Sequence, residues 1–148
     1  MYEYIIHNDA TADIKAALQR DRKTGLRIFK AAQQLRDDQD AMDRLTQRDW
    51  GGSPNRPRPK TATFNTGPWV EAQDAQMNLW RLRFFDEELA GYRFIHAFFP
   101  AYNRYVLLAV VEKAEFGMIH DERFNYELKH PISKRIANSY ERLVEESR

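Results

Sequence analysis

The sequence of 148 residues contains no cysteine. This absence excludes thiol catalysis, disulfide exchange and zinc sites built from cysteine. Long hydrophobic runs are absent too, because the longest, residues 94–101 and 105–111, are much shorter than the roughly 20 residues that span a membrane. The first residues also lack the basic and long apolar segments of a secretory signal. We therefore expect a cytoplasmic protein that has no membrane partner.

Motifs that bind common cofactors are missing as well. The sequence has no glycine-rich phosphate loop, no dinucleotide fingerprint and no nucleophile elbow. Its four histidines lack the short spacing typical of metal ligands and stand at His7, His96, His120 and His130. We therefore expect neither a metal site nor another cofactor. Because His96 lies among aromatic residues, we interpret it as a packed, hydrogen-bonded histidine.

The charge is almost balanced, with 23 basic and 22 acidic side chains and a net charge of +1. Such a balance gives no overall attraction to nucleic acid, so any binding of RNA or DNA depends on local clusters. One cluster exists: no acid lies between Asp49 and Glu71, and three basic residues do, Arg56, Arg58 and Lys60.

This basic cluster falls in a segment that we expect to be irregular. Residues 51–60 include three prolines and two glycines, which prevent regular helix or strand. Two interpretations of the segment remain open. It is either a solvated connector or a surface that contacts RNA through Arg56, Arg58 and Lys60.

The first part of the sequence predicts a strand and a helical hairpin. Alternating side chains indicate a strand over residues 2–7, and helical spacing predicts helices over about 8–22 and 26–36. Thr24 and Gly25 are expected to separate the helices. The inward stripe of the second helix is expected to comprise Ile28, Phe29, Ala32 and Leu35. A further helical turn is predicted at residues 41–45.

The second part predicts a sheet and a final helix. Strands are expected at residues 61–66, 79–84, 92–99 and 104–113, and a helix opens at His130-Pro131. Short connections between the last three strands favour an antiparallel meander. Its final strand is apolar on both faces and therefore belongs inside the sheet. The order predicts an α+β fold: an N-terminal strand and helical hairpin, then a mainly antiparallel twisted sheet and a C-terminal helix.

The strand at residues 79–84 carries the most informative pattern. Its apolar side chains share one face, and Arg81 and Arg83 share the other. Arg93 lies on the following strand. Because arginine is costly to bury, we expect Arg81 and Arg83 on a sheet face that helices do not cover, which Arg93 joins if the register places it alongside. The face is either an ordinary solvent-facing side or a set of fixed guanidinium groups that bind a phosphate.

Several of these segments resemble the sheet of toxins of the RelE/ParE superfamily, in particular the RelE/HigB-like members. They are residues 79–83, 91–93 and 105–111, the last of them followed by Lys113. The resemblance covers roughly residues 2–36 and 78–140, because these toxins also begin with a strand and a helical hairpin. It implies a single RelE/ParE-like domain over residues 1–148, with insertions at about 49–77 and 114–123.

The resemblance implies the toxin of a type II toxin–antitoxin system, an endoribonuclease that cleaves messenger RNA at the ribosome. The 2′-hydroxyl would attack the adjacent phosphate, without a metal. Carried over residue by residue, the implied site comprises Arg81, Arg83, Arg93, Lys113 and Tyr126. The implied partners are an antitoxin from a neighbouring gene, messenger RNA and the ribosome.

Two alternatives follow from the same resemblance. A ParE-like toxin would bind DNA gyrase without hydrolysing RNA, and an inactive domain of this fold would serve only in assembly. The residues after Lys113 are Ala114, Glu115 and Phe116 rather than a basic cluster, which keeps the inactive alternative open.

Overall fold

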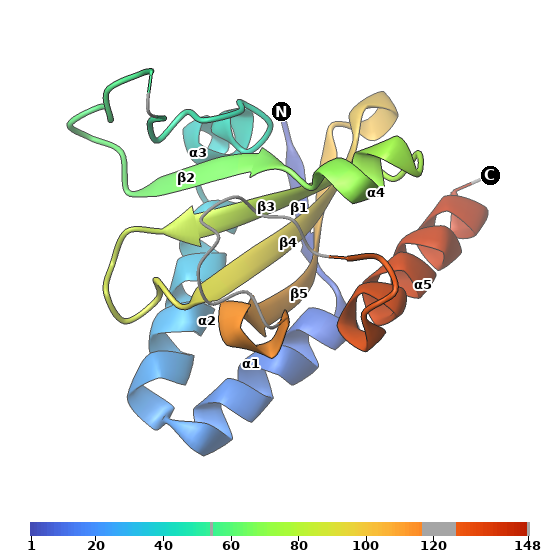
Figure 1. Ribbon diagram of the computed structural model, residues 1–148, viewed down its shortest axis with the longest axis horizontal. Helices are drawn as coiled ribbons and strands as arrows, with labels where there is room; N and C mark the ends of the chain where they lie inside the picture. Colours follow the sequence, from blue (N-terminus) through green and yellow to red (C-terminus); the bar gives the residue numbers. More distant parts are fainter. Residues whose placement is uncertain (54, 117–126, 148) are drawn as a thin grey trace.

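The computed structural model describes residues 1–53, 55–116 and 127–147, and Figure 1 shows a sheet with helices around it. The strands are β1 (Glu3–Ile6), β2 (Phe64–Pro68), β3 (Leu79–Phe84), β4 (Tyr92–Phe99) and β5 (Arg104–Glu112). The helices are α1 (Asn8–Arg20), α2 (Arg22–Arg36), α3 (Gln39–Arg44), α4 (Val70–Asp74) and α5 (Pro131–Glu146), with 3₁₀ turns η1 (Pro100–Tyr102) and η2 (Lys113–Phe116). Within the described ranges, no helix has the length and apolar character needed to cross a membrane.

The five strands form one mixed sheet in the order β1-β5-β4-β3-β2. Strands β3, β4 and β5 make the predicted antiparallel meander, and β2 adds an antiparallel edge. Strand β1 pairs in parallel with β5, so β5 lies inside the sheet as its apolar sequence predicts. The α+β class is confirmed.

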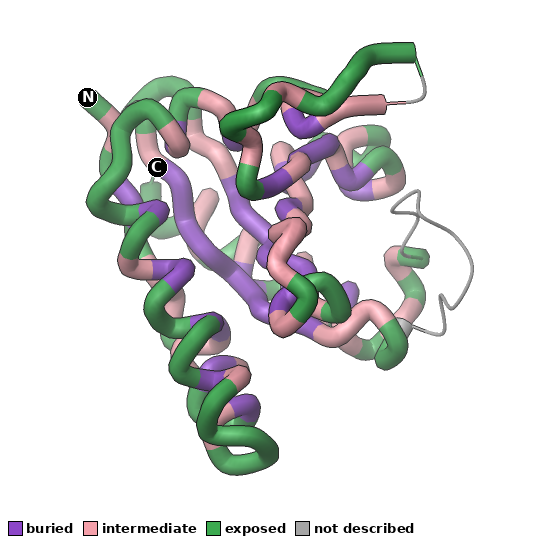
Figure 2. The backbone as a smooth tube through the Cα atoms, turned by 90° about the vertical axis from the view of Figure 1, so that its left-hand side faces the viewer, coloured by how far each residue is buried: buried purple, intermediate pink, exposed green. Residues whose placement is uncertain are grey.

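Helices cover both faces of the sheet. One core cluster joins α1, α2 and α3 to the face that carries Leu82 and Phe94, and a second joins α4 and α5 to the face that carries Leu79 and Ile95. Figure 2 shows that the central strands are buried and that the outer turns of the helices are exposed.

The prediction of a helix-free face for the arginines is therefore wrong. By the period of two, Leu79 shares its face with Arg81, and Leu79 packs in one cluster with Ile136 of α5. The face is divided along its length. Helices α4 and α5 cover the apolar part, and the arginines of β3 and β4 follow toward the other end.

The helical hairpin differs from its prediction at the turn. Helix α2 begins at Arg22 because the carboxylate of Asp21 caps it, accepting hydrogen bonds from the amides of Lys23 and Thr24. Gly25 therefore lies inside α2 and does not end α1. A Cβ atom at Gly25 would lie 2.5 Å from the Leu18 Cα, so the glycine allows the two helices to approach closely.

This close approach also decides which side of α2 is buried. The buried stripe is Gly25, Ile28, Ala31, Ala32 and Leu35. Phe29, which the sequence predicts to face inward, lies outside the stripe and is 43% exposed. The physical reason is that packing is centred on Gly25 and Ile28, so a side chain one position farther around the helix points away from the sheet.

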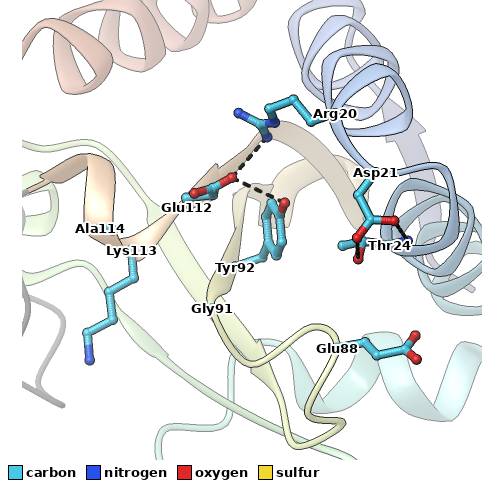
Figure 3. A pocket seen from close by; sticks show the side chains of 9 residues that line it. All are labelled: Arg20, Asp21, Thr24, Glu88, Gly91, Tyr92, Glu112, Lys113 and Ala114. Carbon is cyan, nitrogen blue, oxygen red and sulfur yellow. Dashed lines mark hydrogen bonds and ion pairs between the residues drawn. The ribbon is translucent and has the colours of Figure 1, made fainter.

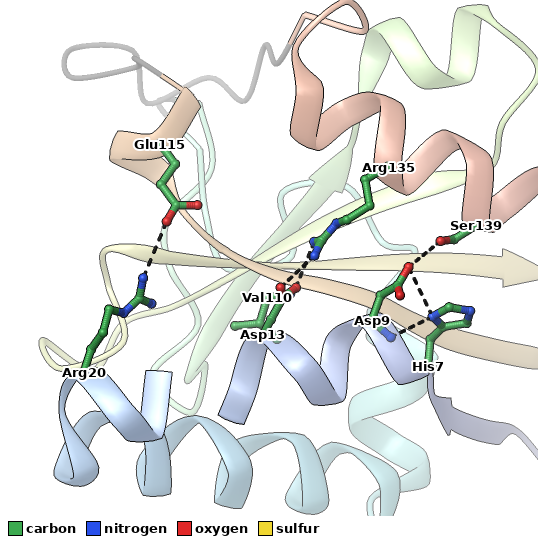
Figure 4. A network of polar contacts seen from close by, with 8 residues as sticks. All are labelled: His7, Asp9, Asp13, Arg20, Val110, Glu115, Arg135 and Ser139. Atoms are coloured by element: carbon green, nitrogen blue, oxygen red, sulfur yellow. Dashed lines mark hydrogen bonds and ion pairs between the residues drawn. The ribbon is translucent and has the colours of Figure 1, made fainter. Parts of the chain in front are cut away.

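The carboxylates of Asp9 and Asp13 on α1 form hydrogen bonds that connect α1 with α5 and β5 (Figure 4). Asp13 accepts hydrogen bonds from both terminal nitrogens of Arg135, at 2.8 and 2.9 Å, and from the amide of Val110, at 3.0 Å. The hydroxyl of Ser139 donates to Asp9 at 2.6 Å. These bonds join three elements that lie far apart in the sequence.

The edge strand β2 departs modestly from expectation. It begins at Phe64 rather than at residue 61, and it continues through Gly67 and Pro68, which were expected to end it. Proline is tolerated there because an edge strand leaves one side of its backbone without a ladder partner. Helix α4, which follows directly, was not predicted.

Candidate nucleic-acid interface

Arg81 and Arg83 share one face of β3, as the alternation predicts. Arg81 stands between Gly67 of β2 and Ile95 of β4, and Arg83 stands beside Asn65 of β2. A Cβ atom at Gly67 would lie 3.3 Å from Nη2 of Arg81. The missing side chain at Gly67 thus gives the guanidinium of Arg81 room to lie across β2.

Arg93 occupies the same face but is buried. Only 3% of its surface is exposed. Its Nη1 donates hydrogen bonds of 2.8 Å to the carbonyls of Ala90 and Tyr92, so the guanidinium folds back on the connection between β3 and β4. Arg93 therefore supports this connection, and little of its surface is open to a ligand.

Phe85 brings the arginines of the strand and of the loop together. It directly follows β3, and its amide donates to the carbonyl of Thr63 at 3.0 Å. The guanidinium carbon of Arg58 lies 3.7 Å from the centre of the Phe85 ring, and that of Arg83 lies 5.7 Å from it. Both distances are within the range of cation–π attraction.

Sequence reasoning missed Phe85. The available signal was the continuation of the alternation through residues 81, 83 and 85, which puts an aromatic ring beside the two arginines. No pattern in the sequence indicates that Arg58, 27 positions earlier in the chain, lies over this ring.

The basic loop before β2 is held in place by backbone and amide contacts. The Asn65 side chain accepts a hydrogen bond from the Gly51 amide at 2.9 Å and donates one to the Gly52 carbonyl at 3.2 Å. Gly52 has a φ of +112°, which side-chain-bearing residues rarely adopt. Ser53 and Arg56 form an isolated antiparallel β-bridge, so backbone hydrogen bonds hold these two residues together.

Lys113 begins η2, where β5 ends, and its amide donates to the Gly91 carbonyl at 2.8 Å. It lines a cavity of about 530 Å³ together with Tyr92 and Glu112. Figure 3 shows the Lys113 side chain extending away from these two residues. Because Lys113 follows Glu112 in the chain, the two side chains leave the strand in opposite directions. Tyr126 lies outside the described residues.

Tyr92 and Glu112 form a separate polar pair on the other side. The Tyr92 hydroxyl donates to Glu112 at 3.2 Å, and Arg20 of α1 makes a 3.1 Å ion pair with the same carboxylate. Burial raises the pKa of Tyr92, and the negative charge of Glu112 raises it further. Tyr92 therefore stays a neutral phenol at physiological pH.

The charges near the interface are divided unequally. Two of the three acids that follow β3 are neutralised by α2: Asp86 pairs with Arg27, and Glu88 pairs with Lys23 at 3.1 Å, whereas the exposed Glu87 makes no ion pair with a described residue. Eleven described cations, leaving Arg81 and Arg93 aside, make no ion pair with a described residue, and five of them lie in the loop before β2, on β3 or at the end of β5: Arg56, Arg58, Lys60, Arg83 and Lys113. We call these five residues the unpaired cations.

Comparisons with models of known protein families, with curated proteins and with solved structures gave no match to this chain. Its class is therefore defined by its fold and surface alone. The chain is an α+β protein in which Arg58 and Arg83 meet at Phe85, beside one end of a mixed sheet.

Proposed function

We propose that this chain is a RelE-like toxin of a type II toxin–antitoxin system, an endoribonuclease that cleaves messenger RNA at the ribosome. One observation carries the proposal. Arg58 and Arg83 meet at Phe85 without an acidic partner among the described residues. The nearby acids Asp86 and Glu88 are paired with cations of α2 instead. Cations that no protein acid neutralises attract the phosphates of a nucleic acid.

The fold supports the proposal. A first strand, a helical hairpin, an antiparallel meander and a C-terminal helix agree with the architecture that the resemblance to RelE/ParE toxins implies. Strand β2 and helix α4 both fall within residues 49–77, the segment interpreted as an insertion.

In the proposed reaction, the 2′-oxygen of one nucleotide forms a bond to the adjacent phosphorus, and the bond from phosphorus to the 5′-oxygen breaks. The proton of the 2′-hydroxyl passes to a base, and the 5′-oxygen takes up a proton as it leaves. The guanidinium groups of Arg81 and Arg83 stabilise the charge that develops on the phosphate. Arginine does not give up a proton in proteins, so Lys113 is the proton donor that we assign to the leaving oxygen.

The proposal predicts that expression of the chain in bacteria cleaves messenger RNA and arrests growth. Arg83→Ala should lower cleavage by about 100-fold, since loss of one group that stabilises a transition-state charge has effects of this size. Lys30→Ala on α2 is the matched control because it removes one exposed charge outside the interface. Cleavage sites are mapped by primer extension on ribosome-associated messenger RNA.

Intact RNA and normal growth under expression of the original chain would contradict the nuclease. Suppose instead that growth stops, RNA stays intact and the purified protein inhibits supercoiling by DNA gyrase. The gyrase-binding alternative would then replace the nuclease proposal. If neither effect occurs, an inactive interaction domain remains. In each toxin alternative, we propose an antitoxin from a neighbouring gene as the partner, and co-expression of that gene should restore growth.

A further inference from the structure

Phe85 is an aromatic side chain without a role in either core. It belongs to neither of the two buried clusters, and the partners of its ring are guanidinium groups. Its backbone is nevertheless fixed, because its amide continues the pairing of the sheet through Thr63. A partly exposed ring on a rigid backbone is what stacking of a planar ligand requires.

Arg58 covers this ring from the loop side. Its guanidinium carbon is 3.7 Å from the ring centre, which is the separation of two stacked planar groups. The side chain is exposed and forms no ion pair with a described residue, so it can leave the ring without breaking one. The backbone of Arg58 packs against Gly52, where an added Cβ atom would lie 3.1 Å from the Arg58 Cα, and Asn65 in turn holds Gly52.

The size and chemistry of this arrangement fit one nucleotide. A planar guanidinium on an aromatic ring occupies the space that a nucleobase would take, and a base stacks on either surface. Arg83, 5.7 Å from the same ring, is close enough to hold the phosphate next to a stacked base. A double helix does not offer such a base, because its bases already stack on each other.

We infer that Phe85 and Arg58 form a stacking site for one unpaired base of single-stranded RNA, with Arg83 on the adjacent phosphate. The inference rests on the proposed function, and it adds which base of the RNA is recognised, namely the base next to the phosphate that Arg83 holds in the reaction. Phe85 and Arg58 are binding residues in this account, and neither takes part in proton transfer.

The test uses a single-stranded 2′-O-methyl RNA of twelve nucleotides with 2-aminopurine at successive positions. The methyl group blocks attack by the 2′-oxygen, so binding is measured without cleavage. Binding is followed by anisotropy, and stacking is followed by quenching of the 2-aminopurine fluorescence. Circular dichroism checks that each variant remains folded.

Phe85→Leu should weaken binding by about 5- to 100-fold, the effect of losing one stacked base, and should abolish quenching at one position. Phe85→Trp should restore both the affinity and the quenching.

The salt dependence of binding separates stacking from phosphate contact. Phe85→Leu should leave it unchanged because no charge is lost, whereas Arg83→Ala should lower the slope of log K against log salt by about 0.7. Arg58→Lys keeps the charge and should still reduce quenching, and Lys60→Ala should leave quenching intact.

The two proposals fail in different ways. If Phe85→Leu binds and quenches like the original protein while Arg83→Ala still weakens binding, the stacking site is wrong and the RNA-binding surface stands. If neither substitution changes binding, or if the protein does not bind the RNA, the proposed function fails together with the site.

Discussion

Arg83 and Arg93 show how one residue type takes two roles on one face of a sheet. Both side chains point to the same side, yet Arg83 is partly exposed beside Phe85 and Arg93 is buried against the carbonyls of Ala90 and Tyr92. Alternation along a strand predicts the side of the sheet. It does not predict burial, because burial depends on how the connection between β3 and β4 folds back.

Arg93→Ala should therefore destabilise the fold, whereas Arg83→Ala should not. The loss of two partly buried, charged hydrogen bonds to backbone carbonyls costs about 2–4 kcal/mol in the free energy of unfolding. Arg83→Ala should change it by less than about 0.5 kcal/mol. Urea unfolding of both variants measures the difference. Equal stability of the two variants would contradict the structural role of Arg93.

His96 is the packed histidine that its strand position predicts. It is 1% exposed, and its Nε2 lies 2.6 Å from the hydroxyl of Tyr4. Burial lowers the pKa of His96 to about 3 and raises that of Tyr4. The imidazole of the folded protein thus stays neutral near pH 7.

The buried histidine predicts a loss of stability in acid. Between about pH 6.5 and pH 3, the unfolded chain binds a proton at His96 and the folded chain does not, so stability falls as the pH falls. One such proton changes the free energy of unfolding by about 1.4 kcal/mol per pH unit. His96→Gln, which keeps a hydrogen-bonding group beside Tyr4, should reduce the slope between pH 4 and 6 by about that amount. If urea titrations of His96→Gln give the same slope of unfolding free energy against pH, His96 is not the source of the acid sensitivity.

At the scale of elements, the helical hairpin depends on one glycine. Gly25 lies in α2 against the backbone of Leu18, and the capping carboxylate of Asp21 fixes where α2 starts. The sequence predicts both helices from their apolar spacing, but it places the break at Thr24 and Gly25. The error arises because glycine ends helices often, and its role in close packing becomes visible only when both helices are placed.

Gly25→Ala should destabilise the protein although alanine favours helix. The added methyl meets the Leu18 backbone at 2.5 Å, and overpacking of this kind costs about 1–3 kcal/mol, more than the gain of about 1 kcal/mol in helix propensity. Gly91→Ala is the matched control because a Cβ there meets nothing within 4 Å. Thermal unfolding should separate the two variants, and a more stable Gly25→Ala protein would show that the helices do not pack as closely as described.

The bonds between Asp13 and Arg135 make α5 part of the same body as α1. The bidentate pair and the bond from Val110 to Asp13 are partly buried, and hydrogen bonding to Asp13 raises the pKa of Arg135. A double-mutant cycle with Asp13→Asn and Arg135→Gln should give a coupling of about 1 kcal/mol, since Arg135 is 37% exposed and solvent screens the pair. Additive effects of the two changes would remove this link between the helices.

The sheet shows what sequence patterns predict well. The bounds of β3 and β4 agree with their predictions because a polar connection separates the two strands and Pro100 follows β4. The parallel pairing of β1 with β5 is a contact across about a hundred residues of sequence, and no local pattern encodes it. The same holds for the interface, in which Arg58 and Phe85 come from different segments.

At the scale of the whole molecule, a nearly neutral chain still separates its charges. Lys23, Arg27 and Arg20 on the hairpin neutralise acids of the sheet and its connections, while the loop before β2 and the end of β3 keep cations without such partners. The net charge of +1 therefore gives no measure of how strongly this surface attracts an anion.

The central claim, that Arg58 and Arg83 form the RNA-binding surface, is tested most directly by two double variants of equal charge. Arg58→Ala/Arg83→Ala removes two cations from the interface, and Arg22→Ala/Lys30→Ala removes two exposed cations from α2. We predict that Arg58→Ala/Arg83→Ala lowers the slope of log K against log salt for single-stranded RNA by about 0.7, because the phosphate contact of Arg83 is lost, and that Arg22→Ala/Lys30→Ala leaves the slope unchanged. Equal slopes for the two double variants would contradict the claim.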